Sequence, residues 1–230
     1  MTPHALAATK RIVAHAFGRA FDDIFDEFDE VPLGAGAVAQ VYRAKLKPDL
    51  VPPTLVEEKN FRQNFREKVD GLVKVTPGQG VPSSYVAVKV LHPDVGKTVN
   101  RDLRIMRFFA GLINAIPTME WLSLPDEVDV FSDMMRLQMD LRIEGENLAK
   151  FRNNFKGRNT VTFPIPYREY TTRDMLIEEF IHGIPLNDFL DNGGGIYQEG
   201  MANMGLDAFL VSLFCHLRRR AATKCLPSTC

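Results

Sequence analysis

The spacing of apolar residues predicts a helix at the start of the chain. Leu6, Val13 and Phe17 recur at roughly helical spacing and the apolar period continues to Phe28, so we expect one helix within residues 1–30. The first twenty residues also contain His, Lys and Arg but no acidic residue, which is typical of a mitochondrial presequence. Because the apolar period continues beyond any cleavage point, a structural helix is favoured over a presequence.

Three short segments have the pattern of β-strands. Residues 38–46 follow a glycine-containing loop, residues 86–91 alternate cleanly between two faces, and residues 175–181 are mostly apolar. In the second segment the valines share one face, and Lys89 lies on the other. Residues 47–84 are bounded by prolines and glycines and contain a capping box followed by apolar residues at helical spacing. We therefore expect a helical insertion between the first two strands.

Two long helices are expected between the second and third strands. Residues 94–116 form an apolar series that ends at Pro117, and residues 125–155 begin with acidic and end with basic residues, as the helix dipole favours. We expect both helices to pack on a short antiparallel sheet. In the second helix, Glu144 interrupts an apolar stripe formed by Leu137, Leu141, Leu148 and Phe151.

A last helix is expected at about residues 197–217. Its natural partner surface is absent from the sequence, so we expect four of its apolar side chains to be exposed and to cause poor solubility or association with another chain. These side chains belong to Phe209, Leu210, Leu213 and Phe214.

Composition restricts the classes of function. The chain has 230 residues, of which 45% are hydrophobic, and a formal net charge of −1, which argues against wholesale binding of nucleic acid or anionic membrane. No uncharged apolar run approaches the roughly 20 residues needed to span a bilayer. The three cysteines, Cys215, Cys225 and Cys230, have neither metal-ligand nor disulfide-framework spacing, so a reducing compartment is expected.

A glycine-containing loop precedes the first strand and is suited to binding phosphate. Glycines let the backbone approach phosphate oxygens closely, and free amides in such a turn favour anions. The loop is not a Walker A motif and opens no helix, so it is not a dinucleotide fingerprint either. By itself this signal is weak, because glycine pairs are common in turns. The loop reads Gly34, Ala35, Gly36, Ala37, Val38, Ala39, Gln40 and Val41.

Lys89 and Glu144 supply the candidate charges of a nucleotide site. Ala87, two residues before Lys89, leaves room for a flat ring, beyond which the ammonium would reach phosphates. A lysine-glutamate pair between strand and helix is what positions the lysine of a kinase. The alternatives are a solvated lysine on a surface strand and a hydrated edge of the helix at Glu144.

These segments together resemble the UbiB (aarF-domain) atypical kinase family, most closely its mitochondrial branch, over about residues 15 to 212. The matching motifs are residues 32–42, 86–93, 138–147 and 176–186. The resemblance implies an α+β fold, a protein-kinase-like small lobe at residues 31–182, followed by the helical start of a large lobe and a divergent tail at 183–230. It also implies ATP binding by residues 34–41, Ala87, Lys89 and Glu144, with Glu179 and Ile181 in a hinge that bonds adenine.

The resemblance further implies a mitochondrial location, a role in ubiquinone or lipid metabolism, transferase chemistry with Mg²⁺, and a membrane lipid or protein partner. The chain departs from the family, however. A Lys-x-Gly-Gln motif is absent, Gln138 replaces a family glutamate, and His216 lacks the aspartate of the catalytic loop. Neither Mg²⁺ ligand is found. We therefore expect a truncated chain with no catalytic residue, a weak or partial ATP site and no nucleic-acid partner.

Two other interpretations remain open at this point. The first is a non-catalytic protein- or lipid-binding module built on the small lobe and its insertion. The second is a fragment of a conventional serine/threonine kinase, which the residues around Glu144 and the loop at 34–41 fit less well.

Overall fold

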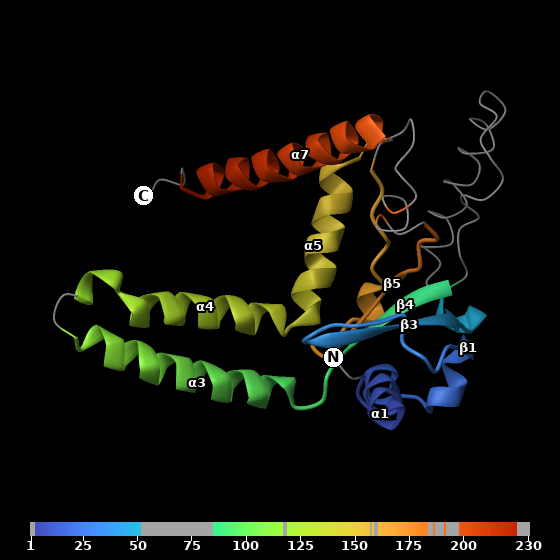
Figure 1. Ribbon diagram of the computed structural model, residues 1–230. Helices are drawn as coiled ribbons and strands as arrows, with labels where there is room; N and C mark the ends of the chain where they lie inside the picture. Colours follow the sequence, from blue (N-terminus) through green and yellow to red (C-terminus); the bar gives the residue numbers. More distant parts are fainter. Residues whose placement is uncertain are drawn as a thin grey trace, which may run out of the picture.

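The computed structural model in Figure 1 describes residues 3–51, 85–116, 119–156, 158, 161–183, 186, 191 and 198–224. The helical insertion expected at 47–84 lies almost wholly outside these residues; only its first part, which contains the short 3₁₀ helix η2 (Pro48–Leu50), is described.

A five-stranded antiparallel sheet forms the centre of the fold. Its order is β1-β3-β4-β5, with the short β2 paired to β3. The sheet joins all three predicted strands, although the third ends two residues earlier than expected. The strands are β1 (Phe25–Phe28), β2 (Gly34–Ala35), β3 (Ala39–Leu46), β4 (Tyr85–Leu91) and β5 (Met175–Glu179).

The alternation predicted for β4 is confirmed. Val86, Val88 and Val90 are buried in a core on one face of the sheet, together with Val13 of helix α1 (Leu6–Phe17). Leu91, on the opposite face, packs in a second, smaller cluster with Leu141. Since successive strand residues point to opposite faces, the same alternation places Lys89 on the side of the second cluster.

The N-terminal helix is shorter than the expected span of 1–30. It ends at Phe17, where Gly18 adopts a left-handed φ of 64° that favours glycine. Phe25 and Phe28, whose spacing seemed to continue the helix, lie in β1 and pair with β3. Their rings contact each other and Phe21 of the 3₁₀ helix η1 (Phe21–Asp23), so the apolar period reflects an aromatic cluster.

The long helix expected at 125–155 is two helices, α4 (Leu124–Gln138) and α5 (Leu141–Asn154), which run in different directions in Figure 1. Asp140 separates them, because its backbone is extended and its side chain accepts a hydrogen bond from the N–H of Arg142, at 3.0 Å. A hydrogen bond from the Arg142 guanidinium lowers the pKa of Asp140, which keeps this helix cap charged at neutral pH.

Replacing Asp140 with alanine is expected to lower the free energy of unfolding by about 1 kcal/mol, because the first turn of α5 loses its cap. Urea unfolding followed by circular dichroism at pH 7 measures this. Asp133→Ala is the control, since Asp133 is an exposed α4 residue whose ion pair with Arg136 lies on the surface. Equal losses for the two variants would contradict the capping role.

Of the two long helices expected to pack on the sheet, only the part that forms α5 does so. Helix α3 (Val95–Asn114) and α4 lie side by side as a hairpin that projects away from the sheet, bridged by an ion pair between Arg107 and Asp129. The expectation that α3 packs on the sheet is therefore wrong beyond its first residue, Val95, which packs against the second cluster. The hairpin instead exposes large apolar side chains: Ile105, Met106, Phe108, Phe109, Leu112, Ile113, Ile116, Met119, Trp121, Val130, Phe131, Met134 and Leu137.

The last helix, α7 (Gln198–Lys224), lies across the far end of α5 (Figure 1). Phe209, Leu210 and Leu213 are exposed as predicted, and the side chain of Phe214 is not among those described. Two further 3₁₀ turns, η3 (Glu120–Leu122) and η4 (Arg168–Tyr170), complete the described elements. Among the described helices, none combines the length and apolar character needed to cross a bilayer.

Candidate functional site

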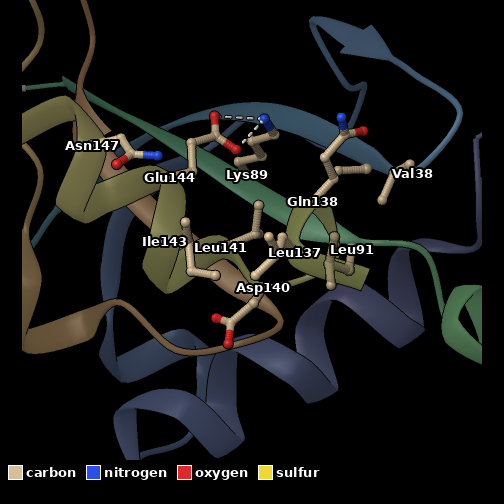
Figure 2. A pocket seen from close by; sticks show the side chains of 11 residues that line it. Val38, Lys89, Leu91, Leu137, Gln138, Asp140, Leu141, Ile143, Glu144 and Asn147 are labelled. Atoms are coloured by element: carbon tan, nitrogen blue, oxygen red, sulfur yellow. Dashed lines mark hydrogen bonds and ion pairs between the residues drawn. The ribbon is translucent and has the colours of Figure 1, made fainter. Parts of the chain in front are cut away.

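A pocket of about 510 Å³ lies between the sheet and the junction of α4 with α5, and Figure 2 shows its lining. The sheet contributes the tip region of the glycine-containing hairpin and the end of β4, and the two helices contribute the opposite wall. The residues that line it are Val38, Ala39, Lys89, Leu91, Leu137, Gln138, Asp140, Leu141, Ile143, Glu144 and Asn147.

The structure brings Lys89 and Glu144 into contact. The ammonium of Lys89 lies 2.7 Å from Oε1 and 2.8 Å from Oε2 of Glu144, although the residues are 55 positions apart in sequence (Figure 2). Gly145 permits this approach of α5 to the sheet, since a Cβ at that position would lie only 3.2 Å from Leu176 of β5. The predicted ion pair between strand and helix is therefore present.

The ion pair is less buried than the sequence suggested. The Lys89 side chain is 28% exposed and that of Glu144 is 45% exposed, so water reaches the edge of the pocket. The predicted apolar stripe is interrupted as well, because Leu137 belongs to α4 and Leu141 to α5. A partly solvated pair is not costly to maintain, and the ammonium remains accessible to a ligand.

The predicted phosphate loop is a tight β-hairpin. Gly34 and Ala35 pair with Val41 and Gln40, and the N–H of Gly36 donates to the carbonyl of Ala39 at 2.8 Å. At the tip, the amides of Ala37 and Val38 donate to no acceptor among the described residues. These two N–H groups are consequently available to an anion.

Val41 and Gln40 follow the alternation of β3. Val41 lies opposite Lys89 in the sheet and therefore on the pocket side. Gln40 is completely buried on the opposite face, where its amide hydrogen-bonds within the core against α1. The side chain of Gln40 thus points away from the pocket, and the place of residue 40 in a nucleotide loop remains a prediction.

The remaining predicted residues lie outside the pocket lining. Ala87 is buried on the same face as Lys89. Glu179 is buried, its N–H donates to the carbonyl of Ile165, and its carboxylate accepts from the Ile165 N–H. Both the backbone N–H and the carboxylate of Glu179 are therefore engaged by Ile165 within the protein. Ile181 follows β5 with a side chain 44% exposed. A hinge that bonds adenine remains a prediction.

Sequence reasoning missed Glu178 as a member of this site. It pairs with Ala87 across the sheet, on the face of Lys89, and is mostly buried. Burial, reinforced by the charge of Glu144 and opposed by that of Lys89, raises the pKa of Glu178 to about 7. Successive side chains of a strand point to opposite faces, so Glu178 lies on the face opposite to Ile177 and Glu179, which is the pocket side. This geometric rule was the signal that the sequence offered.

The helix junction also adds lining residues that were not among the predicted site residues, although most lie in the motif at 138–147: Leu137, Gln138, Asp140, Leu141, Ile143 and Asn147. They come together only because the chain turns sharply between α4 and α5. Within the part of the chain that the structure describes, no three His, Cys, Asp or Glu side chains gather as a metal site would require.

Relatives of this chain are found among curated proteins. A mitochondrial ABC1 family protein of Schizosaccharomyces pombe is 40% identical over 216 residues, which are 93% of this chain and 30% of that protein. A mitochondrial ABC1 family protein of Saccharomyces cerevisiae is 40% identical over 191 residues, 83% of this chain and 26% of its own. A probable protein kinase UbiB of Aeromonas hydrophila is 25% identical, over 92% of this chain and 33% of its own. The chain spans about a third or less of the length of these relatives.

The fold is also found among solved structures. A Mycobacterium tuberculosis protein, determined in complex with erythromycin, matches with a TM-score of 0.56 at 19% identity, over 83% of this chain and 39% of its own. The predicted kinase-like small lobe is thereby confirmed as a fold. Residues 2–51 and 74–217 match the ABC1 atypical kinase-like domain. This chain therefore belongs to the ABC1 (UbiB) atypical kinase-like family.

Proposed function

We propose that this chain carries the small-lobe half of an atypical kinase site and binds ATP in the pocket between its hairpin and α5. The observation that carries the proposal is the bidentate contact of Lys89 with Glu144, immediately beside the base of a hairpin whose tip amides are unengaged among the described residues. An ammonium held in this way is positioned for the α- and β-phosphates.

The pocket fits such a ligand in size and chemistry. Its volume of about 510 Å³ lies in the usual range for small-molecule sites, and Val38, Leu91 and Leu141 provide apolar surface beside the charged pair. ATP, when bound, supplies the transferable phosphoryl group. The roles of the protein are to hold its phosphates through Lys89 and the tip amides, and to keep Lys89 oriented through Glu144.

The location and wider role are part of the same proposal. Two yeast relatives are named as mitochondrial, which supports a mitochondrial location for this chain. Kinase or transferase activity of a whole protein, and the expected link to ubiquinone or lipid metabolism, remain proposals, since this chain covers only part of each relative.

We expect the 230-residue chain to bind ATP without hydrolysing it in the presence of Mg²⁺. The sequence holds no His-x-Asp-Leu-His-Pro-Gly-Asn catalytic loop, and phosphoryl transfer requires Mg²⁺ ligands of the kind that such a loop supplies. Competition of ATP against a fluorescent analogue measures binding, and release of inorganic phosphate measures turnover. Absence of saturable binding at millimolar ATP would reject the proposal. Phosphate release that Lys89→Ala abolishes would show that the chain is catalytically competent.

One observation favours the alternative of a binding module. The α3–α4 hairpin exposes Phe108 (64%) and Trp121 (79%) among many apolar side chains, and such a surface marks an interaction site. Charges of both signs border it, since α3 carries Arg101, Arg104 and Arg107 and α4 carries Asp126, Glu127 and Asp129. A mixed border of this kind favours a protein partner over an anionic lipid surface. Sedimentation velocity of the chain tests this, since Phe108→Glu should reduce self-association whereas Arg104→Glu should not. Flotation with anionic vesicles would instead indicate a lipid surface.

A further inference from the structure

A chain of polar side chains crosses the core between α1 and the tip of the nucleotide hairpin. His4, just before α1, contacts His92, which follows β4, with 2.7 Å between their Nδ1 atoms. His92 Nε2 lies 2.9 Å from the Gly36 carbonyl, and His4 Nε2 lies 2.9 Å from Thr9 Oγ1. Beyond Thr9, the network continues to Tyr42 and Gln40, both fully buried.

One atom sets the direction of the hydrogen bonds between the two histidines. The Gly36 carbonyl can only accept, so His92 Nε2 carries a proton and donates it. With His92 neutral, its Nδ1 is an acceptor, and His4 Nδ1 must donate to it. His4 Nε2 is then the acceptor for the hydroxyl of Thr9.

The rest of the network agrees with this direction. Since Thr9 gives its proton to His4, its oxygen accepts from the Tyr42 hydroxyl, at 3.1 Å. Tyr42 in turn accepts from the amide nitrogen of Gln40, whose amide oxygen accepts from the His4 backbone N–H. The direction of each hydrogen bond from Gly36 to Tyr42 is thus consistent with a single tautomer at each histidine. Burial, and then the neighbouring His92, lower the pKa of His4, which is consistent with a neutral imidazole at His4.

His92 holds the hairpin tip on both sides of Ala37. Its backbone N–H donates to the Val38 carbonyl at 2.9 Å, while its ring donates to the Gly36 carbonyl. In a planar trans peptide the N–H points opposite to the preceding carbonyl. Holding the Gly36 carbonyl toward His92 therefore directs the Ala37 N–H away from His92 and from the α1 side of the sheet.

We propose that His92 is a positioning residue for the nucleotide hairpin: its Nε2–H holds the Gly36 carbonyl so that the Ala37 N–H at the tip faces a phosphate, and His4 selects the tautomer that makes this possible. The segment before α1 is thus coupled to the nucleotide site through two imidazoles. The proposal deepens the proposed ATP-binding function and rests on it for its consequence, but the tautomers and the ordered tip do not require a nucleotide.

The first experiment needs no nucleotide. Long-range ¹H–¹⁵N correlation spectra of the histidine-labelled chain at pH 7.5 should show His92 as the neutral Nε2–H tautomer and His4 as the neutral Nδ1–H tautomer. Amide exchange of Ala37 and Val38 should be unchanged in His92→Gln, whose side-chain amide can still donate, and altered in His92→Leu. His92 found as the Nδ1–H tautomer, or averaging between tautomers, would overturn the proposal.

The second experiment measures ATP affinity in the same variants. His92→Leu should weaken binding about three- to tenfold, the value of one lost hydrogen bond, and His92→Gln should restore it to within about twofold. His4→Ala should show a smaller loss, and His15→Ala, at an exposed α1 position, should show none. Unchanged affinity in His92→Leu would overturn the proposal.

The two experiments separate the possible failures. If the tautomers and the tip order are as expected but the wild-type chain binds no ATP, the proposed function fails while the positioning of the hairpin stands. If ATP binds but the tautomers differ, the positioning proposal alone fails. Rescue by His92→Gln at an unchanged melting temperature distinguishes positioning from a general loss of stability.

Discussion

Replacing Lys89 with alanine is expected to weaken ATP binding about 10- to 100-fold. The variant removes the single ammonium of the pocket lining, which lies beside the phosphate-binding hairpin and is held by both oxygens of Glu144. A hydrogen bond to a charged group contributes about 1.5–3 kcal/mol, and each 1.4 kcal/mol is a tenfold change in affinity. Competition titration against a fluorescent ATP analogue measures the effect.

Two further variants give this prediction its controls. Lys97→Ala removes a lysine of α3 that is 85% exposed and paired with Asp94, so its affinity should be unchanged. Glu144→Gln keeps the shape of the pocket but not the charge that orients Lys89, and a smaller loss is expected. Equal affinity of Lys89→Ala and the wild-type chain, with folding intact, would place the nucleotide elsewhere.

Replacing Glu178 with glutamine is expected to stabilise the protein at alkaline pH and to leave it unchanged at acidic pH. The pKa of Glu178 is raised to about 7 in the folded state, from an ordinary value of 4.5. The folded protein therefore binds this proton more tightly than the unfolded chain does, and the wild type loses stability as pH rises from about 4.5 to about 7. Glutamine, which does not titrate, avoids that loss.

The magnitude follows from the size of the shift. At about 1.4 kcal/mol per pKa unit, the loss is up to about 3 kcal/mol across the whole window, and about 2 kcal/mol of it falls between pH 5.5 and pH 8.5. Urea unfolding of both proteins at these two pH values measures it. Glu146→Gln, at an exposed position of α5, is the matched control. A stability difference between Glu178→Gln and wild type that is the same at both pH values would contradict the prediction.

The local elements were largely predictable because short-range patterns determine them. Strand β4 has strict alternation, and α3 has a helical apolar series that ends before a proline, so both matched their expected spans closely. The length of the N-terminal helix was overestimated because the helical apolar period that revealed the helix continues beyond its end. Phe25 and Phe28 satisfy a helical period, but the left-handed residue Gly18 and pairing with β3 place them in a strand.

The site was predictable where its chemistry stands out against its surroundings. A lysine in a valine-rich strand and a glutamate in an apolar helix were conspicuous in the sequence, and the structure brings them within hydrogen-bonding distance. The orientations of Gln40 and Glu178 were not predicted. Their roles depend on which face of the sheet each residue occupies and on what covers that face, and neither is visible in a segment read alone.

The sequence by itself determined the positions of three of the five described strands and of most helical segments, the candidate ammonium and carboxylate, and the resemblance to an atypical kinase. Only the tertiary structure decided that the chain turns at Asp140, that the α3–α4 hairpin leaves the sheet, and that His4 and His92 meet beside Gly36. The physical reason is the separation in sequence of the residues that interact. Periodicity and capping act over a few residues, whereas these contacts join positions up to 88 apart and form only when two faces of one sheet are covered.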